Sequence, residues 1–126
     1  MKKKAKMLII DDSIETVAGL SYFFSRKYEV STAMDGFAGL ELFIAEENGF
    51  DIIITDVVMP DISGVGVAAI IKRKCPDIPV IAITGWGGQP LALASESEAD
   101  IVMDKPVELP DLDRQVTELL SGNVAI

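Results

Sequence analysis

Five short apolar segments recur along the chain, and polar or turn-forming residues separate them. In four of them at least three apolar residues follow one another, as in Met7-Leu8-Ile9-Ile10. Such a run is typical of a strand that is covered on both faces, as the strands of a parallel sheet are. We therefore expect five strands, at residues 5–10, 29–33, 51–55, 80–84 and 100–103.

The segments between and after these strands carry apolar residues at helical spacing. The fourth of them, at residues 91–97, is a weak pattern, and the fifth is clear. The residues that define the other four helices are Ile14, Val17 and Phe24; Phe37, Leu40, Phe43 and Ile44; Val67, Ala68, Ile70 and Ile71; and Leu109, Leu112, Val116, Leu119 and Leu120. Turn-forming residues agree with these boundaries, because Asp35-Gly36 precedes the second helix and Pro110 suits the first turn of the last.

Strands that alternate with helices in this way predict parallel strands joined by right-handed crossovers. The expected fold class is α/β: a single doubly wound, five-stranded parallel sheet sandwiched by five helices, of flavodoxin-like type. A length of 126 residues suits one domain with one core. We expect a single domain over residues 1–126, with a core at about residues 5–121 and no output domain within the chain.

Composition and charge narrow the possible functions. The net charge of −9 argues against direct nucleic-acid binding, because phosphate backbones need a basic face. The chain has no histidine, which removes histidine-based acid–base catalysis and most zinc chemistry. No apolar run is long enough to cross a bilayer, so we expect no membrane insertion. Cys75 is the only cysteine, which fits a cytoplasmic location.

Charged residues stand at the ends of three strand segments. Asp11-Asp12 follows the first, Asp56 follows the third, and Lys105 follows the fifth. Because groups at the carboxyl ends of parallel strands meet in one crevice, we expect three carboxylates and one ammonium to converge there. Three carboxylates cannot share a small volume without a cation, so a divalent metal is expected. The alternative for Asp12 or Ser13 is a simple helix cap.

The residues at this edge also suit phosphorus chemistry. A carboxylate at the tip of a buried strand, as at Asp56, needs a partner or a reaction, and it can attack phosphorus to form an acyl phosphate. Lys105 can reach a carboxylate or a phosphoryl oxygen, although a weak surface salt bridge is the alternative. The Lys105-Pro106 bond could be cis, which would aim the lysine. The hydroxyl of Thr84 can donate to a phosphoryl oxygen, but a strand-end threonine is usually structural.

Together these residues resemble the receiver domain of two-component response regulators. The likeness covers almost the whole chain, and each matching residue lies at or just after a predicted strand end. The matching residues are Asp11-Asp12, Asp56 with Met59-Pro60 and Gly64, Thr84, and Lys105-Pro106. The resemblance implies a receiver-type signalling domain and not a conventional enzyme, since such a domain catalyses only its own phosphorylation and dephosphorylation.

The resemblance further implies a Mg²⁺ site. Asp12 and Asp56 would bind the ion directly, and Asp11 would act through a bound water. The backbone carbonyl of Val58 would be a further protein ligand, which leaves the side chain of Val58 free to vary.

A phosphorylation cycle is implied as well. Asp56 would be the phosphoacceptor and would take the phosphoryl group from a histidine kinase or a histidine phosphotransfer protein. Lys105 would pair with this group, and Thr84 would move towards it and draw the following loop along. The movement would switch a protein-interaction surface, and a homodimer is one assembly that such a surface could form.

The chain departs from the family at three places. Val102 stands where relatives often have a Tyr or Phe that reports the movement of the threonine, which puts the usual coupling in doubt. Glu98 replaces a frequent glycine, and with the weak helical pattern before it predicts a short or mobile fourth helix. Val58 and Trp86 flank the expected position of the hydrolytic water, and neither side chain can orient it, which predicts a long-lived acyl phosphate. Trp86 could equally be a packing residue.

Three other functions fit parts of the pattern. A phosphohydrolase with an aspartyl phosphate would need a second Asp two residues after the nucleophile, where this chain has Val58. A flavodoxin-like cofactor binder would need a phosphate-cradling loop, where this chain has Asp11-Asp12. A degenerate receiver, acting only as a phosphorylation-independent interaction module, keeps some support from Val102. The sequence leaves open whether the chain is a stand-alone receiver or part of a longer regulator or hybrid kinase.

Overall fold

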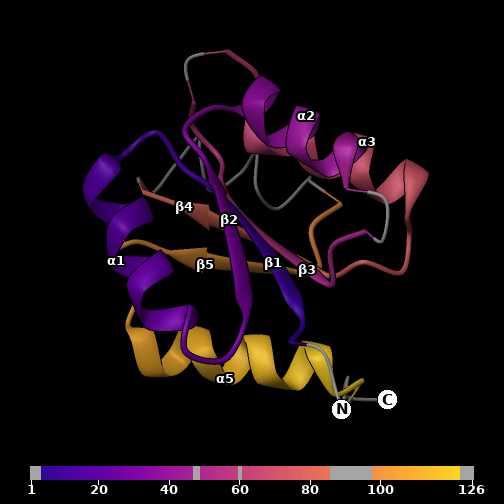
Figure 1. Cartoon of the computed structure of the whole chain (residues 1–126). Helices are drawn as coiled ribbons and strands as arrows, with labels where there is room; N and C mark the ends of the chain where they lie inside the picture. Colours follow the sequence, from indigo (N-terminus) through magenta and orange to yellow (C-terminus); the bar gives the residue numbers. More distant parts are fainter. Residues whose placement is uncertain (1–3, 47–48, 60, 86–97, 123–126) are drawn as a thin grey trace.

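The computed structural model describes residues 4–46, 49–59, 61–85 and 98–122 (Figure 1). Within these ranges five strands alternate with four helices. The strands are β1 (Lys6–Ile10), β2 (Glu29–Ala33), β3 (Ile52–Asp56), β4 (Val80–Thr84) and β5 (Ile101–Asp104). The helices are α1 (Ile14–Phe24), α2 (Gly36–Ala45), α3 (Gly64–Lys74) and α5 (Leu109–Leu120). None of these described helices has the length and apolar character needed to span a membrane.

The strand boundaries lie within one residue of the predicted ones, and the predicted fourth helix lies outside the described residues. The prediction for the third strand was shifted, because β3 begins at Ile52 and ends at Asp56. Asp51 lies before the strand, where its carboxylate accepts a hydrogen bond from the backbone N–H of Lys6 at 2.7 Å. Asp56 is itself a strand residue, so pairing with Ile83 of β4 holds its backbone in place.

All five strands are parallel and lie in the order β2-β1-β3-β4-β5. Helices α1 and α5 cover one face of the sheet, and α2 and α3 cover the other (Figure 1). The predicted doubly wound α/β fold is therefore confirmed, with four helices in the described part of the chain. The chain moves outward from β1 to β2 and then continues at β3 on the other side of β1, so the topological switch point lies between β1 and β3. Ligands of doubly wound sheets bind beside this point, outside the carboxyl ends of the strands.

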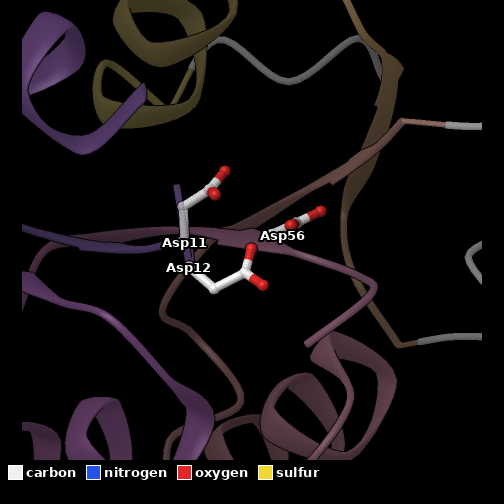
Figure 2. Close-up of side chains that lie close together, drawn as sticks. All are labelled: Asp11, Asp12 and Asp56. Carbon is white, nitrogen blue, oxygen red and sulfur yellow. The ribbon is translucent and has the colours of Figure 1, made fainter. Parts of the chain in front are cut away.

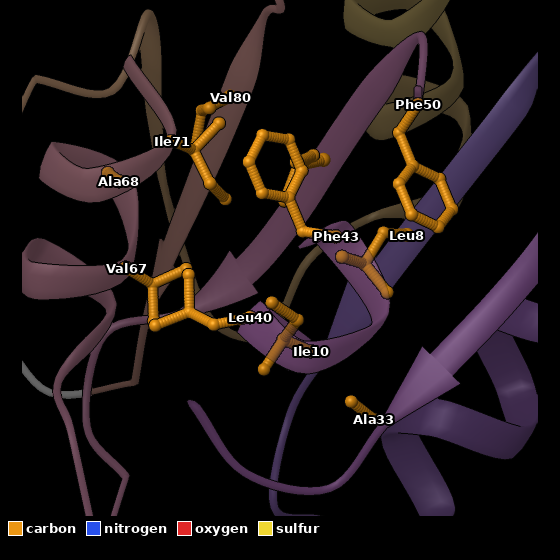
Figure 3. Packing of buried hydrophobic residues seen from close by; sticks show 11 residues of the cluster. Leu8, Ile10, Ala33, Leu40, Phe43, Phe50, Val67, Ala68, Ile71 and Val80 are labelled. Atoms are coloured by element: carbon orange, nitrogen blue, oxygen red, sulfur yellow. The ribbon is translucent and has the colours of Figure 1, made fainter. Parts of the chain in front are cut away.

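Packing on both faces explains why the strands are apolar throughout. Successive side chains of a strand point to opposite faces, so Leu8 packs with α2 and α3 whereas Met7 packs with α1 and α5. The buried residues of the first cluster, shown in Figure 3, are Leu8, Ile10, Ala33, Leu40, Phe43, Phe50, Ile53, Val67, Ala68, Ile71 and Val80. Those of the second are Met7, Ile9, Leu20, Phe24, Ile52, Ile54, Ile81, Ile83, Leu112 and Val116.

Helical spacing predicts helix α2 correctly but not the whole of its buried face. Phe37 and Ile44 belong to the apolar pattern, yet they are 61% and 67% exposed. The helix instead buries Gly36, Leu40 and Phe43 against the sheet and its neighbours. Each exposed residue directly follows a buried one and so lies about 100° further round the helix. Apolar character at these two positions therefore does not mark the core.

We predict that Ile53→Ala lowers the free energy of unfolding by about 2–5 kcal/mol, because it leaves a cavity where a fully buried side chain was. The matched control is Ile44→Ala on the exposed side of α2, which should change this free energy by no more than about 0.5 kcal/mol. Urea unfolding followed by circular dichroism measures both values. Equal losses in the two variants would contradict the assignment of the core.

Candidate functional site

Four predicted site residues lie at the carboxyl edge of the sheet. Asp11 directly follows β1, Asp56 ends β3, Thr84 ends β4, and Lys105 directly follows β5. Backbone hydrogen bonds fix two of these positions: the N–H of Asp11 donates to the carbonyl of Ala33 at 3.1 Å, and that of Lys105 donates to the carbonyl of Thr84 at 2.7 Å. The sheet therefore brings these residues to the crevice beside the switch point.

Three aspartates at this edge form one cluster (Figure 2). Asp11, Asp12 and Asp56 each offer one carboxylate oxygen, and these atoms all lie within 4.8 Å of one another. Asp11 and Asp56 are only 2% and 5% exposed, whereas Asp12 is an exposed residue. An ion can therefore reach two buried carboxylates from solvent on the side of Asp12.

Ser13 caps helix α1. This observation decides between the two interpretations of Asp12, a helix cap or a member of the acidic cluster. The hydroxyl of Ser13 accepts a hydrogen bond from the N–H of Thr16 at 3.2 Å. The N–H of Ser13 in turn donates to a carboxylate oxygen of Asp11 at 2.9 Å. Ser13 is therefore the capping residue, and the carboxylate of Asp12 belongs to the cluster.

Lys105 places its ammonium group beside two of the carboxylates. Its Nζ atom lies 3.1 Å from an oxygen of Asp11 and 3.5 Å from an oxygen of Asp56. The Lys105–Pro106 peptide bond is cis, one of the two forms that the sequence allowed. Burial lowers the pKa of Lys105, but the negative charges of Asp56 and Asp11 outweigh it and raise the pKa above its ordinary value. Lys105 is thus a partly buried counter-ion of the cluster.

The cluster still carries excess negative charge, because in the described part of the site one ammonium faces three carboxylates. Burial raises the pKa of Asp56, the charge of Asp11 raises it further, and the attraction of Lys105 offsets these effects only in part. A divalent cation would correct the imbalance, and carboxylate oxygens are the ligands that hard cations such as Mg²⁺ take. The donor set therefore fits the predicted ion.

The β3–α3 loop, described at residues 57–59 and 61–63, carries Val58, and its two ends lie close together beside the cluster. The N–H of Val57 donates to the carbonyl of Ile83 at 2.9 Å, and the carbonyl of Val57 accepts from the N–H of Gly64 at 2.8 Å. A Cβ atom on Gly64 would collide with the carbonyl oxygen of Asp56, so this close approach requires glycine. The side chain of Val58 is 48% exposed, and the binding of metal by its carbonyl stays a prediction.

The other predicted residues have different surroundings. Thr84 is buried at the end of β4, with 1% of its surface exposed. Val102 is partly buried and packs against a small cluster that contains Val57 and Ala82. Trp86 lies outside the described residues, so its part in hydrolysis stays a prediction.

One contact at this edge was not predicted from the sequence. The carboxylate of Asp61, in the β3–α3 loop, accepts hydrogen bonds from the N–H groups of Gly36 and Phe37 at the start of α2. Aspartate is common in turns for purely local reasons, so its presence in a loop gives no signal of a distant partner.

Fold and site together define a doubly wound α/β domain with an acidic cluster and a lysine at its switch point. The family described as response regulator receiver domain matches residues 7–117 of the chain. The chain belongs to this family, and the resemblance stated from the sequence is confirmed.

Individual relatives agree with this assignment. The chain is 34% identical over 119 residues to the probable transcriptional regulator ycf27 of Cyanophora paradoxa, which covers 93% of the chain and 48% of that protein. A receiver domain protein from Clostridium thermocellum is 31% identical, with a TM-score of 0.85 over 94% of this chain and 96% of that one. The response regulator TrrA from Thermotoga maritima, in complex with Mg²⁺-BeF, is 29% identical, with a TM-score of 0.81 over 91% and 98%. The chain spans about half the length, or less, of the curated relatives compared with it.

We predict that Asp56→Asn raises the melting temperature by a few degrees at neutral pH in EDTA, because it removes a buried charge that Asp11 repels. The pKa of Asp56 is raised in the folded state, so ionisation costs no stability below the ordinary carboxyl pKa of about 4. The loss of stability caused by ionising Asp56 grows as the pH rises from the ordinary pKa to the raised pKa. This loss is fully present above the raised pKa.

Thermal unfolding monitored by circular dichroism measures this effect. The matched control is Asp104→Asn, which removes an exposed acid at the end of β5 and should leave the melting temperature unchanged. A lower melting temperature for Asp56→Asn would show that the ionised Asp56 is not a source of repulsion.

Proposed function

We propose that this domain accepts a phosphoryl group on Asp56 from the phosphohistidine of a histidine kinase or a histidine phosphotransfer protein. The observation that carries the proposal is the cluster of Asp11, Asp12 and Asp56 with the ammonium of Lys105 beside it. Membership in the receiver family supports the same function. The domain would act as a signalling protein that catalyses only its own modification and its reversal.

In the transfer, a carboxylate oxygen of Asp56 attacks phosphorus in line with the bond to the histidine nitrogen. The P–O bond forms as the P–N bond breaks, and the departing imidazole keeps the bonding electron pair and takes a proton from solvent. Later a water molecule attacks phosphorus and the P–O bond to Asp56 breaks. This step releases inorganic phosphate and regenerates the carboxylate.

Mg²⁺ is the cofactor of this proposal, and the presence of Mg²⁺ in the TrrA complex supports it. Asp12 and Asp56 would hold the ion directly. Asp11 would act through a water, and the Val58 carbonyl would be a further ligand. When bound, the ion would offset the negative charge of the phosphoryl oxygens. Lys105, whose Nζ atom lies 3.5 Å from a carboxylate oxygen of Asp56, would pair with the transferred group.

The proposed output is a change in a protein-interaction surface. Thr84 would move towards the phosphoryl group and draw the following loop with it. The second candidate function, an interaction module that works without phosphorylation, rests on Val102 alone, which lacks the aromatic ring that often reports this movement. A homodimer and a cytoplasmic location are further parts of the proposal. The single cysteine excludes an internal disulfide, which supports the cytoplasmic location.

We predict that the wild-type domain gains a phosphoryl group from acetyl phosphate or a phosphorylated kinase when Mg²⁺ is present, and that Asp56→Asn gains none. The asparagine amide cannot form the acyl phosphate. Intact-protein mass spectrometry measures the gain, and EDTA should abolish it. Asp104→Asn is the control and should behave as wild type. An unmodified wild-type domain would instead favour the phosphorylation-independent module.

We predict that Val58→Asn shortens the lifetime of the acyl phosphate several-fold, because an amide beside Asp56 can orient the attacking water. The Val58 side chain is about half exposed, so the change costs little packing. The decay of the phosphorylated mass over time gives the lifetime. Val58→Ala removes the same apolar group without adding an amide and should stay near wild type. A wild-type lifetime no longer than that of Val58→Asn would refute the expectation.

A further inference from the structure

Asp61 attaches the β3–α3 loop to helix α2. Its two carboxylate oxygens accept hydrogen bonds from the first two N–H groups of the helix, those of Gly36 at 3.1 Å and Phe37 at 2.9 Å. Partial loss of water tends to raise the pKa of Asp61, but hydrogen bonds from backbone N–H groups outweigh this effect and lower the pKa to about 2. The carboxyl group of Asp61 is therefore ionised at neutral pH. Its negative charge interacts favourably with the partial positive charge at the N-terminus of helix α2.

Apolar packing strengthens this attachment. Ile62, the neighbour of Asp61, lies so close to Gly36 that a Cβ atom there would collide with its side chain. Ile62 is also partly buried against the core cluster between the sheet and helices α2 and α3. The loop is thus held on α2 by charged hydrogen bonds and by apolar contact at the same place.

Val58 lies between two fixed points of the loop. On one side, the hydrogen bond between the Val57 carbonyl and the Gly64 N–H closes the loop beside Asp56. On the other side, Asp61 holds the loop on α2, three residues after Val58. Val58 therefore lies in the chain between these two attachments.

We propose that Asp61 is a positioning residue of the metal site: its hold on α2 fixes the β3–α3 loop so that the Val58 carbonyl can bind the ion. The inference rests on the proposed function, because it requires that the aspartate cluster binds Mg²⁺. Groups that orient metal ligands without touching the metal are typically worth about 10–100-fold in affinity. Asp61 is not itself one of the clustered carboxylates.

Asp61 could instead serve only as a cap of α2, and Asp35 provides the control for this possibility. The side chain of Asp35 accepts a hydrogen bond from the N–H of Ala38 at 2.7 Å, at the same end of the same helix. Removing either aspartate takes one negative charge and one capping group from α2. Only the removal of Asp61 also releases the β3–α3 loop.

Isothermal titration of the full chain with MgCl₂ tests the proposal in three proteins: wild type, Asp61→Ala and Asp35→Ala. We expect the Kd for Mg²⁺ to rise about tenfold in Asp61→Ala and to stay close to the wild-type value in Asp35→Ala. Both variants should melt at a lower temperature than wild type, since both lose a cap. At saturating Mg²⁺ the rate of phosphorylation of Asp61→Ala should recover, because the lost interaction affects affinity for the ion.

Unchanged Mg²⁺ affinity in Asp61→Ala would overturn the proposal, and so would an equal loss in Asp35→Ala, which would reveal an effect of charge or capping alone. If Asp61→Ala does not fold, Asp61→Asn, which keeps one acceptor oxygen, takes its place with a smaller expected loss. Failure of the proposed function looks different. Wild type would then bind no Mg²⁺, or Asp56→Asn would bind it as well as wild type does, and both proposals would fall together.

Discussion

The contact of Lys105 with two buried carboxylates is the interaction on which the site depends. Asp11 and Asp56 are almost shielded from solvent, where like charges repel far more strongly than in water. The ammonium of Lys105 lies beside both, but Asp12 adds a third carboxylate, so the compensation is incomplete. A sheet that is packed on both faces holds these groups together against their repulsion. Burial of the apolar core therefore offsets the free-energy cost of holding the charged groups together at this edge.

The same imbalance suits the site to its proposed chemistry. Negative charge in excess of one lysine favours the binding of a divalent cation, and in the proposed reaction this cation and Lys105 would offset the charge of the phosphoryl group together. The carboxylate of Asp56 lies at the end of β3 within the cluster, so the proposed attack on phosphorus would need little rearrangement of this group. The chain has no histidine, and this reaction needs none, because the histidine is part of the donor.

The strands and the acidic edge could be predicted because each leaves a local signal. A run such as Ile52-Ile53-Ile54 marks a strand that is buried on both faces, and parallel topology alone then brings Asp11 and Asp56 together. The exposure of Phe37 could not be predicted, because its spacing and apolar side chain are those of a buried residue. Only the packing of α2 decides which side of the helix faces the sheet. The contact of Asp61 could not be predicted either, since its partners lie 24 and 25 residues away and depend on how the loop folds.

Under the proposed role of Asp61, the metal site and helix α2 would act as one unit. Linkage is reciprocal, so a contact that favours binding of the ion is itself favoured when the ion binds. In β5, Val102 offers only a small side chain packed against Val57 and Ala82, in place of an aromatic ring that could rotate. The described parts of the β3–α3 loop, by contrast, contact β3 and α2, so a displacement of this loop at Asp56 would, in the proposed mechanism, also affect Ile62 and the start of α2. Coupling of this kind would require no aromatic switch residue, because the contacts of Asp61 and Ile62 with α2 would carry it.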